Sequence, residues 1–164
     1  MVECVMAAAP LIPNNQQVYR GMRNPSWSKR GVVSHLAFML RPATPEFPIE
    51  EELSLGLTID AAIDELREHF GVGELSVLAI HDLPHGLTVR EAGEPLKADL
   101  FGLPLFSTDS HQRDLAVTMA TDLANLAHLV PLNQHHNKTR TDRSPSQLGV
   151  IWFVKVIIPI FCVS

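Results

Sequence analysis

The clearest hydrophobic pattern in the chain lies between residues 58 and 71 and predicts an amphipathic helix. Apolar residues recur there at three- and four-residue steps, which is the spacing of one face of an α-helix. Thr58 stands where a capping side chain is preferred, and Gly71 stands where a helix-terminating residue is preferred. The pattern therefore predicts a helix over Ile59–Phe70. Its apolar stripe consists of Ile59, Ala62, Ile63, Leu66 and Phe70.

A second helical pattern begins after Asp109 and runs toward Pro131. Asp109 is a good capping residue, and Gln112 occupies the position three residues later that completes a capping box. Because Pro131 cannot continue a helix, the predicted helix covers Ser110–Leu129. Its apolar face consists of Leu115, Met119, Leu123, Leu126 and Val130.

Four shorter segments predict strands. Val32–Leu40 and Glu74–His81 are compact apolar runs bounded by proline or glycine, which favours buried strands over helices. Leu87–Glu91 alternates polar and apolar residues, and Asp99–Phe106 supplies a further strand. Turn-forming residues separate these segments, so each is expected to be a separate element.

Breaks in the patterning divide the chain into four parts. Residues 1–30 begin with a short apolar run broken by Pro10 and continue as a polar stretch with Gly21 and Pro25 as breakers, so they are predicted to be a flexible lead-in. Residues 31–132 hold the predicted helices and strands and form a compact domain. Residues 133–147 lack periodicity and are predicted to be a polar linker. Residues 148–164 form a separate apolar segment.

The apolar C-terminal segment, Leu148–Val163, has sixteen residues and is interrupted by Lys155 and Pro159. A membrane-spanning helix needs about 20 apolar residues, so this run is short for that role. Its β-branched and aromatic content favours a buried strand over Val150–Ile158. A C-terminal membrane anchor and an exposed, aggregation-prone tail are the alternatives.

The predicted elements together indicate an α+β fold. Their order is strand, helix, strand, strand, helix, strand, which is the split βαβ order of ferredoxin-like domains. Two helices would then cover one face of an antiparallel sheet. The long connections after the first strand and before the last are unfavourable for this arrangement.

Composition and charge indicate which classes of binding partner to expect. Hydrophobic residues make up 46% of the chain, which is enough for a core, and the net charge is −5. Residues 42–100 carry three Lys or Arg and thirteen Asp or Glu, so nucleic acid is not an expected partner. The basic side chains gather instead near the two ends, where solvated flexible chain is predicted. They are Arg20, Arg23, Lys29, Arg30, Lys138, Arg140 and Arg143.

The two cysteines, Cys4 and Cys162, lie near opposite ends of the chain. They form no Cys-x-x-Cys pair and no disulfide framework, which favours a reducing, cytoplasmic setting.

The densest polar cluster is the stretch His81-Asp82-Leu83-Pro84-His85. Imidazole and carboxylate groups are ligands for divalent metals, so His81, Asp82 and His85 are the candidate metal ligands. Asp82 and Pro84 are also ordinary turn formers, and in that alternative the histidines merely flank a solvated turn. Further ligands that the fold could bring to this loop are His35, Asp109 and His111.

The His81-Asp82 doublet resembles the metal-binding pair of HD-type phosphohydrolases. The resemblance covers these two residues, and in that family the doublet lies on a helix, whereas here it follows a predicted strand. It implies a small metal-dependent hydrolase that uses His81, Asp82 and His85.

No nucleophile elbow and no glycine-rich phosphate loop occurs in the sequence. The leading hypothesis is therefore a small acidic accessory or protein-interaction domain without catalysis and without a cofactor, which binds a protein partner or self-associates. The metal-dependent hydrolase is the first alternative. A tail-anchored peripheral membrane protein, held through Leu148–Val163, is the second.

Overall fold

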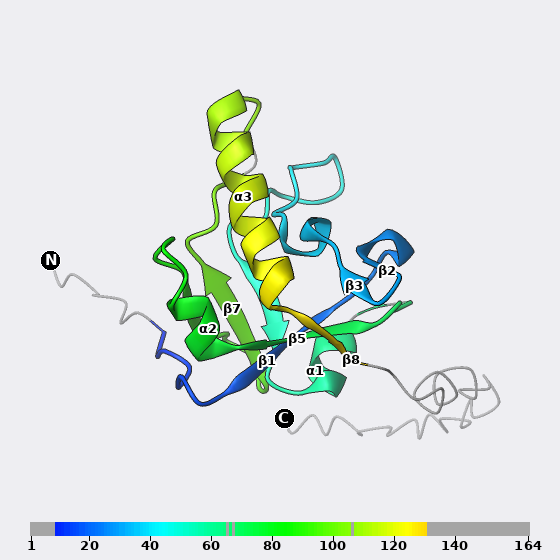
Figure 1. Ribbon diagram of the computed structural model, residues 1–164, viewed down its shortest axis with the longest axis vertical. Helices are drawn as coiled ribbons and strands as arrows, with labels where there is room; N and C mark the ends of the chain where they lie inside the picture. The colour runs from blue at the N-terminus through cyan, green and yellow to red at the C-terminus, as the bar shows by residue number, and fades with distance from the viewer. Residues whose placement is uncertain (1–8, 65, 67, 106, 131–164) are drawn as a thin grey trace, which may run out of the picture. The chain divides into compact units, whose positions relative to one another are not determined.

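A six-stranded antiparallel sheet organises the described part of the chain (Figure 1). The computed structural model describes residues 9–64, 66, 68–105 and 107–130, which belong to one unit spanning residues 1–132. Together they form a small α+β domain with one main helix and an additional two-stranded hairpin. The strand order in the sheet is β6-β7-β4-β1-β5-β8. The strands are β1 Gln17–Gly21, β4 Leu53–Gly56, β5 Val72–Ser76, β6 Thr88–Glu91, β7 Lys97–Phe101 and β8 His128–Val130.

Among the described residues, three α-helices and two short 3-10 helices accompany the sheet, together with the hairpin of β2 (Ser28–Lys29) and β3 (Val32–Val33). Arg30 and Gly31 connect β2 to β3, and both have positive φ angles, as a tight hairpin turn requires. The helices are η1 Pro25–Trp27, η2 His35–Phe38, α1 Ile59–Ile63, α2 Val77–His81 and α3 Ser110–Leu126.

The hydrophobic core lies on the face of the sheet that α3 and η2 cover. Paired positions such as Val18 with Leu75 and Leu53 with Leu100 place buried side chains side by side on that face. The helix α3 contributes buried residues to the same cluster and packs against η2. These residues of α3 are Met119, Ala120, Leu123 and Ala124.

The strand β1 corrects the expectation that residues 1–30 are a flexible lead-in. It pairs with β5 at five positions and with β4 at one, so it lies in the interior of the sheet. Its side chains Val18 and Arg20 are buried. Only one of its five residues is aliphatic, so the sequence shows no alternation there, and the strand depends on partners on both sides.

The segment Val32–Leu40 is a strand only at its start, where β3 lies. Ser34 then caps the 3-10 helix η2 through a hydrogen bond from the Leu36 N–H to its hydroxyl (3.3 Å). The helix turns Ala37 and Phe38 into the core. The prediction of a single buried strand here is wrong because this local cap redirects the chain.

The segment Glu74–His81 also divides into two elements. It is a strand through Ser76, where β5 ends, and a helix from Val77 to His81, where α2 lies. The His81-Asp82 doublet therefore does not follow a strand, in contrast to the expectation from the sequence: His81 is the last residue of the short helix α2 and Asp82 is its C-cap. A compact apolar run cannot distinguish these two structures, because a buried helix turn and a buried strand need the same residues.

The helix α1 begins where the sequence predicts, but it ends earlier. Thr58 accepts a hydrogen bond from the Ala61 N–H at 3.2 Å, which confirms the predicted cap. The helix stops at Ile63 and does not reach Phe70, because the Phe70 N–H donates to the Met22 carbonyl at 2.7 Å. The Met22 N–H in turn donates to the Gly71 carbonyl at 2.9 Å, so residues 70 and 71 extend the pairing beyond β1.

The helix α3 begins at Ser110, as predicted, with the Gln112 N–H donating to Asp109 Oδ1 at 3.0 Å. The Asp109 N–H donates to Ser107 Oγ rather than taking part in the expected capping box. The helix ends at Leu126 and not at Leu129, because residues 128–130 form β8 and pair with β5.

The predicted strands at Leu87–Glu91 and Asp99–Phe106 are confirmed in β6 and β7, with shifted bounds. The ferredoxin-like order is not what the structure shows, because the sheet has six strands and η2 replaces most of the predicted first strand. The linker 133–147, the predicted strand Val150–Ile158 and the segment Leu148–Val163 lie outside the described residues. Within the described ranges, no helix has the length and apolarity that crossing a membrane requires.

Candidate functional site

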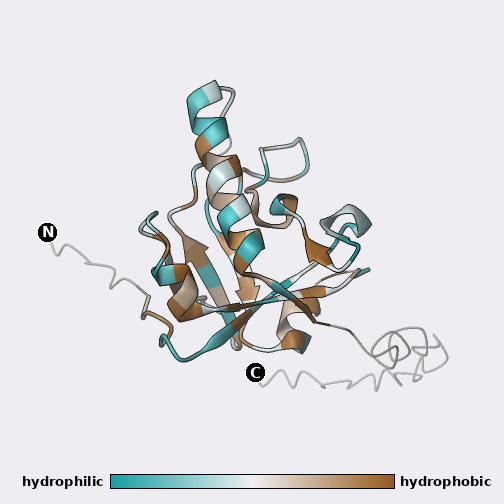
Figure 2. Cartoon of the chain, in the orientation of Figure 1, coloured by the Kyte–Doolittle hydropathy of each residue, from teal (hydrophilic) through white to brown (hydrophobic). Residues whose placement is uncertain are grey.

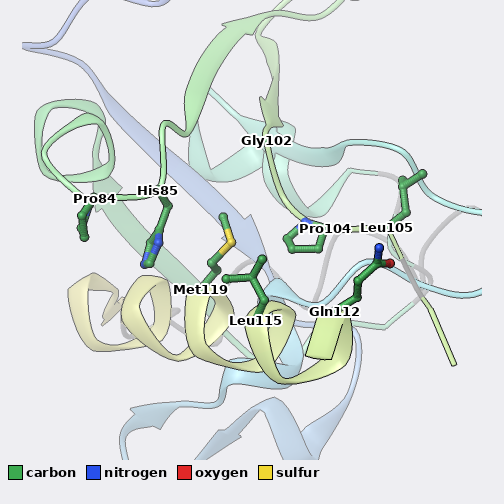
Figure 3. Close-up of a pocket in the computed structure, with 8 residues that line it drawn as sticks. All are labelled: Pro84, His85, Gly102, Pro104, Leu105, Gln112, Leu115 and Met119. Atoms are coloured by element: carbon green, nitrogen blue, oxygen red, sulfur yellow. The ribbon is translucent and has the colours of Figure 1, made fainter. Parts of the chain in front are cut away.

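An open groove of about 590 Å³ lies beside the first half of α3 (Figure 3). Three segments form its walls: the turn after α2, the chain that leaves β7, and one side of α3. We call it the α3 groove. Its described lining residues are Pro84, His85, Gly102, Pro104, Leu105, Gln112, Leu115 and Met119.

Gly102 sets the path of the chain along the groove. Its φ angle is +97°, a conformation that glycine adopts without strain, and it directs the chain away from β7 toward Pro104 and Leu105. A Cβ atom at this position would lie 3.4 Å from the carbonyl oxygen of Gly86. The wall that follows β7 therefore passes closely over the turn that carries His85.

The α3 groove is largely apolar and open to solvent. Leu105 is 47% exposed on one wall and Leu115 is 44% exposed on the other, whereas Met119 is buried at 3%. All residues from Ser110 to Leu115 are exposed, so the first turns of α3 project beyond the core (Figure 1). Figure 2 shows that apolar positions interrupt the polar surface of this helix. Exposed aliphatic side chains on both sides of a groove are typical of binding surfaces.

A histidine and an aspartate add a polar end to the groove. Nε2 of His85 lies 2.7 Å from Oδ2 of Asp122 on α3, and the His85 side chain is only 14% exposed. The contact fixes the orientation of the imidazole ring. A carboxylate that orients a histidine also occurs in general-base catalysis, where the histidine activates a nucleophile. The described residues that line this groove include no hydroxyl or thiol.

The structure engages the side chains of His81 and His85 in separate contacts, and Asp82 in a backbone contact. Nδ1 of His81 lies 2.8 Å from Oδ1 of Asn14, and its Nε2 accepts a hydrogen bond from the Val89 N–H at 3.4 Å. His81 therefore joins the segment before β1 to the start of β6. Asp82 closes α2 through its backbone N–H, which donates to the Leu78 carbonyl at 2.9 Å.

His85 is thus directed to Asp122, and His81 to Asn14 and Val89. Among residues 9–64, 66, 68–105 and 107–130, no three histidine, cysteine or acidic side chains are grouped as a metal site requires. The metal site at His81, Asp82 and His85 stays a prediction, and this geometry adds no support to it.

Sequence reasoning did not find the α3 groove. It placed Leu115 and Met119 together on the buried face of one helix, whereas the structure buries Met119 and exposes Leu115. Helical spacing gives the face of a residue but not whether another element covers that face. The capping signal at Asp109 was the available local clue, since it fixed where the projecting end of α3 begins.

Comparison of the chain with protein-family models, with curated proteins and with solved structures found no match.

Proposed function

We propose that this domain is a non-catalytic protein-interaction module that binds an aliphatic segment of a partner protein in the α3 groove. One observation carries the proposal: Leu105 and Leu115 face solvent from opposite walls of the same groove. Side chains of this kind gain free energy when a partner covers them, at roughly 25 cal/mol per Å² of apolar surface removed from water. The oriented His85 ring offers a hydrogen-bonding group at one end.

Charge indicates the chemistry of the partner. The helix α3 and its capping residue carry three aspartates and one arginine, and residues 42–100 are strongly acidic. A segment with leucine-like side chains flanked by Lys or Arg therefore complements this surface best. Such charges act mainly on the association rate and on the choice of partner, while the buried aliphatic side chains supply most of the affinity.

The proposal can be tested by selecting short random peptides from a display library against the full-length protein. We expect enrichment of peptides that combine aliphatic and basic residues. Leu115→Asp should weaken their binding about tenfold or more, because it places a charge in the apolar wall. Binding would be measured by fluorescence anisotropy of the selected peptides.

Val117→Asp is the matched control for this experiment. Val117 is an exposed aliphatic residue of the same helix, but it does not line the α3 groove. Its variant should bind the selected peptides as the parent protein does. Peptides that bind both variants equally well, or a selection without enrichment, would show that the groove is not a docking site. Concentration-dependent dimerisation that Leu115→Asp abolishes would instead identify a second copy of the chain as the occupant.

The two alternatives from the sequence are a metal-dependent hydrolase and a membrane-anchored protein. For the metal-dependent hydrolase, His81 and His85 have separate side-chain partners, and the described residues contain no group of three candidate ligands. The membrane-anchored alternative depends on Leu148–Val163, which lies outside the described residues. A cytoplasmic location remains a prediction from the cysteine content.

A further inference from the structure

A second hollow, of about 120 Å³, lies between β1 and β4 and is rich in basic side chains. We call it the basic pocket. Its size leaves room for several water molecules, at roughly 30 Å³ each. Its charged or hydroxyl-bearing lining residues are Arg20, Arg23, Arg41, Glu50, Ser54 and Lys97, and the backbone of Gly21 and Gly56 contributes as well.

The basic pocket exists because β1 and β4 pair only at Tyr19 and Gly56. Next to that position, the Arg20 side chain connects β1 to β4 through a hydrogen bond to the β4 backbone. Its Nη1 donates to the Ser54 carbonyl at 2.7 Å, and its Nε donates to the Ala37 carbonyl at 3.1 Å. The guanidinium group thus joins β4 and η2 across the gap.

Arg20 has an unused donor in this position. The residue is only 8% exposed, and its Nη2 has no hydrogen-bond partner among the described residues. Burial, helped by the positive charges of Arg23 and Arg41, lowers the pKa of Arg20 to about 10, so the group remains charged at neutral pH. A buried cation with an unpaired donor is costly unless an anion accompanies it.

Among the described residues that line the basic pocket, Glu50 is the one with a carboxylate. Arg23 Nη2 lies 3.4 Å from Glu50 Oε1, Arg41 Nε donates to the same oxygen at 2.6 Å, and the Arg41 N–H donates to Oε2 at 2.8 Å. Burial acts to raise the pKa of Glu50, but the hydrogen bonds and charge of Arg41 lower it overall, so the carboxylate is ionised at neutral pH. Arg23 and Arg41 thus contact this carboxylate, and Arg20 interacts with it only through its charge. These three guanidinium groups and one carboxylate together leave about two positive charges.

We propose that the basic pocket binds a phosphate group, either as free phosphate or as a phosphomonoester. A phosphate carries about −1.5 to −2 charges at neutral pH and presents several acceptor oxygens, which matches the excess positive charge of the arginines that line the pocket. Arginine is well suited to this role because its planar donors fit phosphate oxygens. The inference is independent of the α3 groove, since the two sites share no lining residue.

The test is a titration of the full-length protein with inorganic phosphate at pH 7.5 and constant ionic strength. Two-dimensional ¹H–¹⁵N spectra would follow the arginine Nε–H signals, and Arg20→Lys would assign the Arg20 signal. We expect a saturable shift of that signal with phosphate and none with acetate at the same concentration. A parallel titration with O-phosphoserine distinguishes the two sources: a shift indicates a phosphomonoester, and its absence alongside a phosphate shift indicates the free ion.

Variants with opposite expected effects make the result specific. Arg23→Gln should weaken phosphate binding about tenfold, because it removes a charged donor from the pocket. Glu50→Gln should strengthen binding, because it removes the competing carboxylate. Arg113→Gln is the control of equal charge change, since Arg113 is exposed on α3 and does not line the pocket.

No saturable shift with phosphate, or equal binding by the Arg23→Gln and parent proteins, would overturn the proposal. Arg23 is partly exposed, so its variant keeps the test decisive even if Arg20→Lys does not fold.

Discussion

Gly21 and Gly56 contact α1 closely. At each of them, the backbone of Ala62 occupies the space that a Cβ atom would need. A Cβ atom on Gly21 would lie 2.2 Å from the Ala62 carbonyl oxygen, and one on Gly56 would lie 2.4 Å from the Ala62 nitrogen. Neither distance is compatible with a side chain. These two glycines therefore allow a helix of one to two turns to contact β1 and β4 through its backbone.

We expect Gly21→Ala and Gly56→Ala each to lower the free energy of unfolding by about 2 kcal/mol or more, because the added methyl group overpacks against backbone that cannot move freely. Gly93→Ala is the matched control, since nothing lies within 4 Å of its Cβ position. Its effect should be within about 0.5 kcal/mol, or stabilising. Urea denaturation followed by circular dichroism measures all three. Equal stabilities would mean that α1 does not pack on these glycines.

At the scale of the element, α3 has two halves with different surroundings. From Ala116 onward it buries one face against the core and η2, whereas the turns before Ala116 are exposed on all sides. Leu115 and Leu123 are eight residues apart and belong to the same broad apolar stripe of the helix. One helical stripe thus changes from core to groove wall along its length.

The two leucines should respond differently to truncation. Leu123→Ala should lower the free energy of unfolding by about 3 kcal/mol, because the side chain is fully buried. Leu115→Ala should lower it by less than about 1 kcal/mol, because the groove already exposes much of that side chain to water. Chemical denaturation of the two variants and the parent provides the comparison. A large loss for Leu115→Ala would indicate that another part of the chain fills the α3 groove.

At the scale of the whole domain, the sheet is held together by strands that are distant in the sequence. Gln17 in β1 pairs with Ser76 in β5, and Leu53 in β4 pairs with Leu100 in β7. Because β1 lies between β4 and β5, it joins the half of the sheet that holds β6 and β7 to the half that ends in β8. The described strands all lie before residue 131.

A chain that starts at residue 31 should therefore lose its cooperative thermal transition, since it lacks the strand that connects the two halves of the sheet. A chain that ends at Gln147 serves as the comparison and should keep the transition, because it retains every described strand. Both would be followed by circular dichroism and size-exclusion chromatography. Cooperative melting of the chain without β1 would contradict the sheet topology.

The sequence by itself determined the features that depend on near neighbours. The starts of α1 and α3 follow from Thr58 and Asp109, whose side chains accept hydrogen bonds from backbone N–H groups three residues later. The strand β6 follows from its short alternating pattern and the turns beside it, and β7 overlaps the strand predicted over Asp99–Phe106 at residues 99–101. These signals involve interactions within a few residues, so a local pattern contains them.

Only the tertiary structure decided the features that depend on distant partners. The strand β1 has little hydrophobic pattern of its own, and it forms because β4 and β5 pair with it on both sides. The Phe70 N–H pairs with the Met22 carbonyl, so the predicted helix does not extend to Phe70. The surroundings of Arg20 and Leu115 likewise follow from elements far away in the chain. Strand pairing and burial join residues that no sequence window contains together, which is why the sequence predicted helix starts but neither the groove nor the pocket.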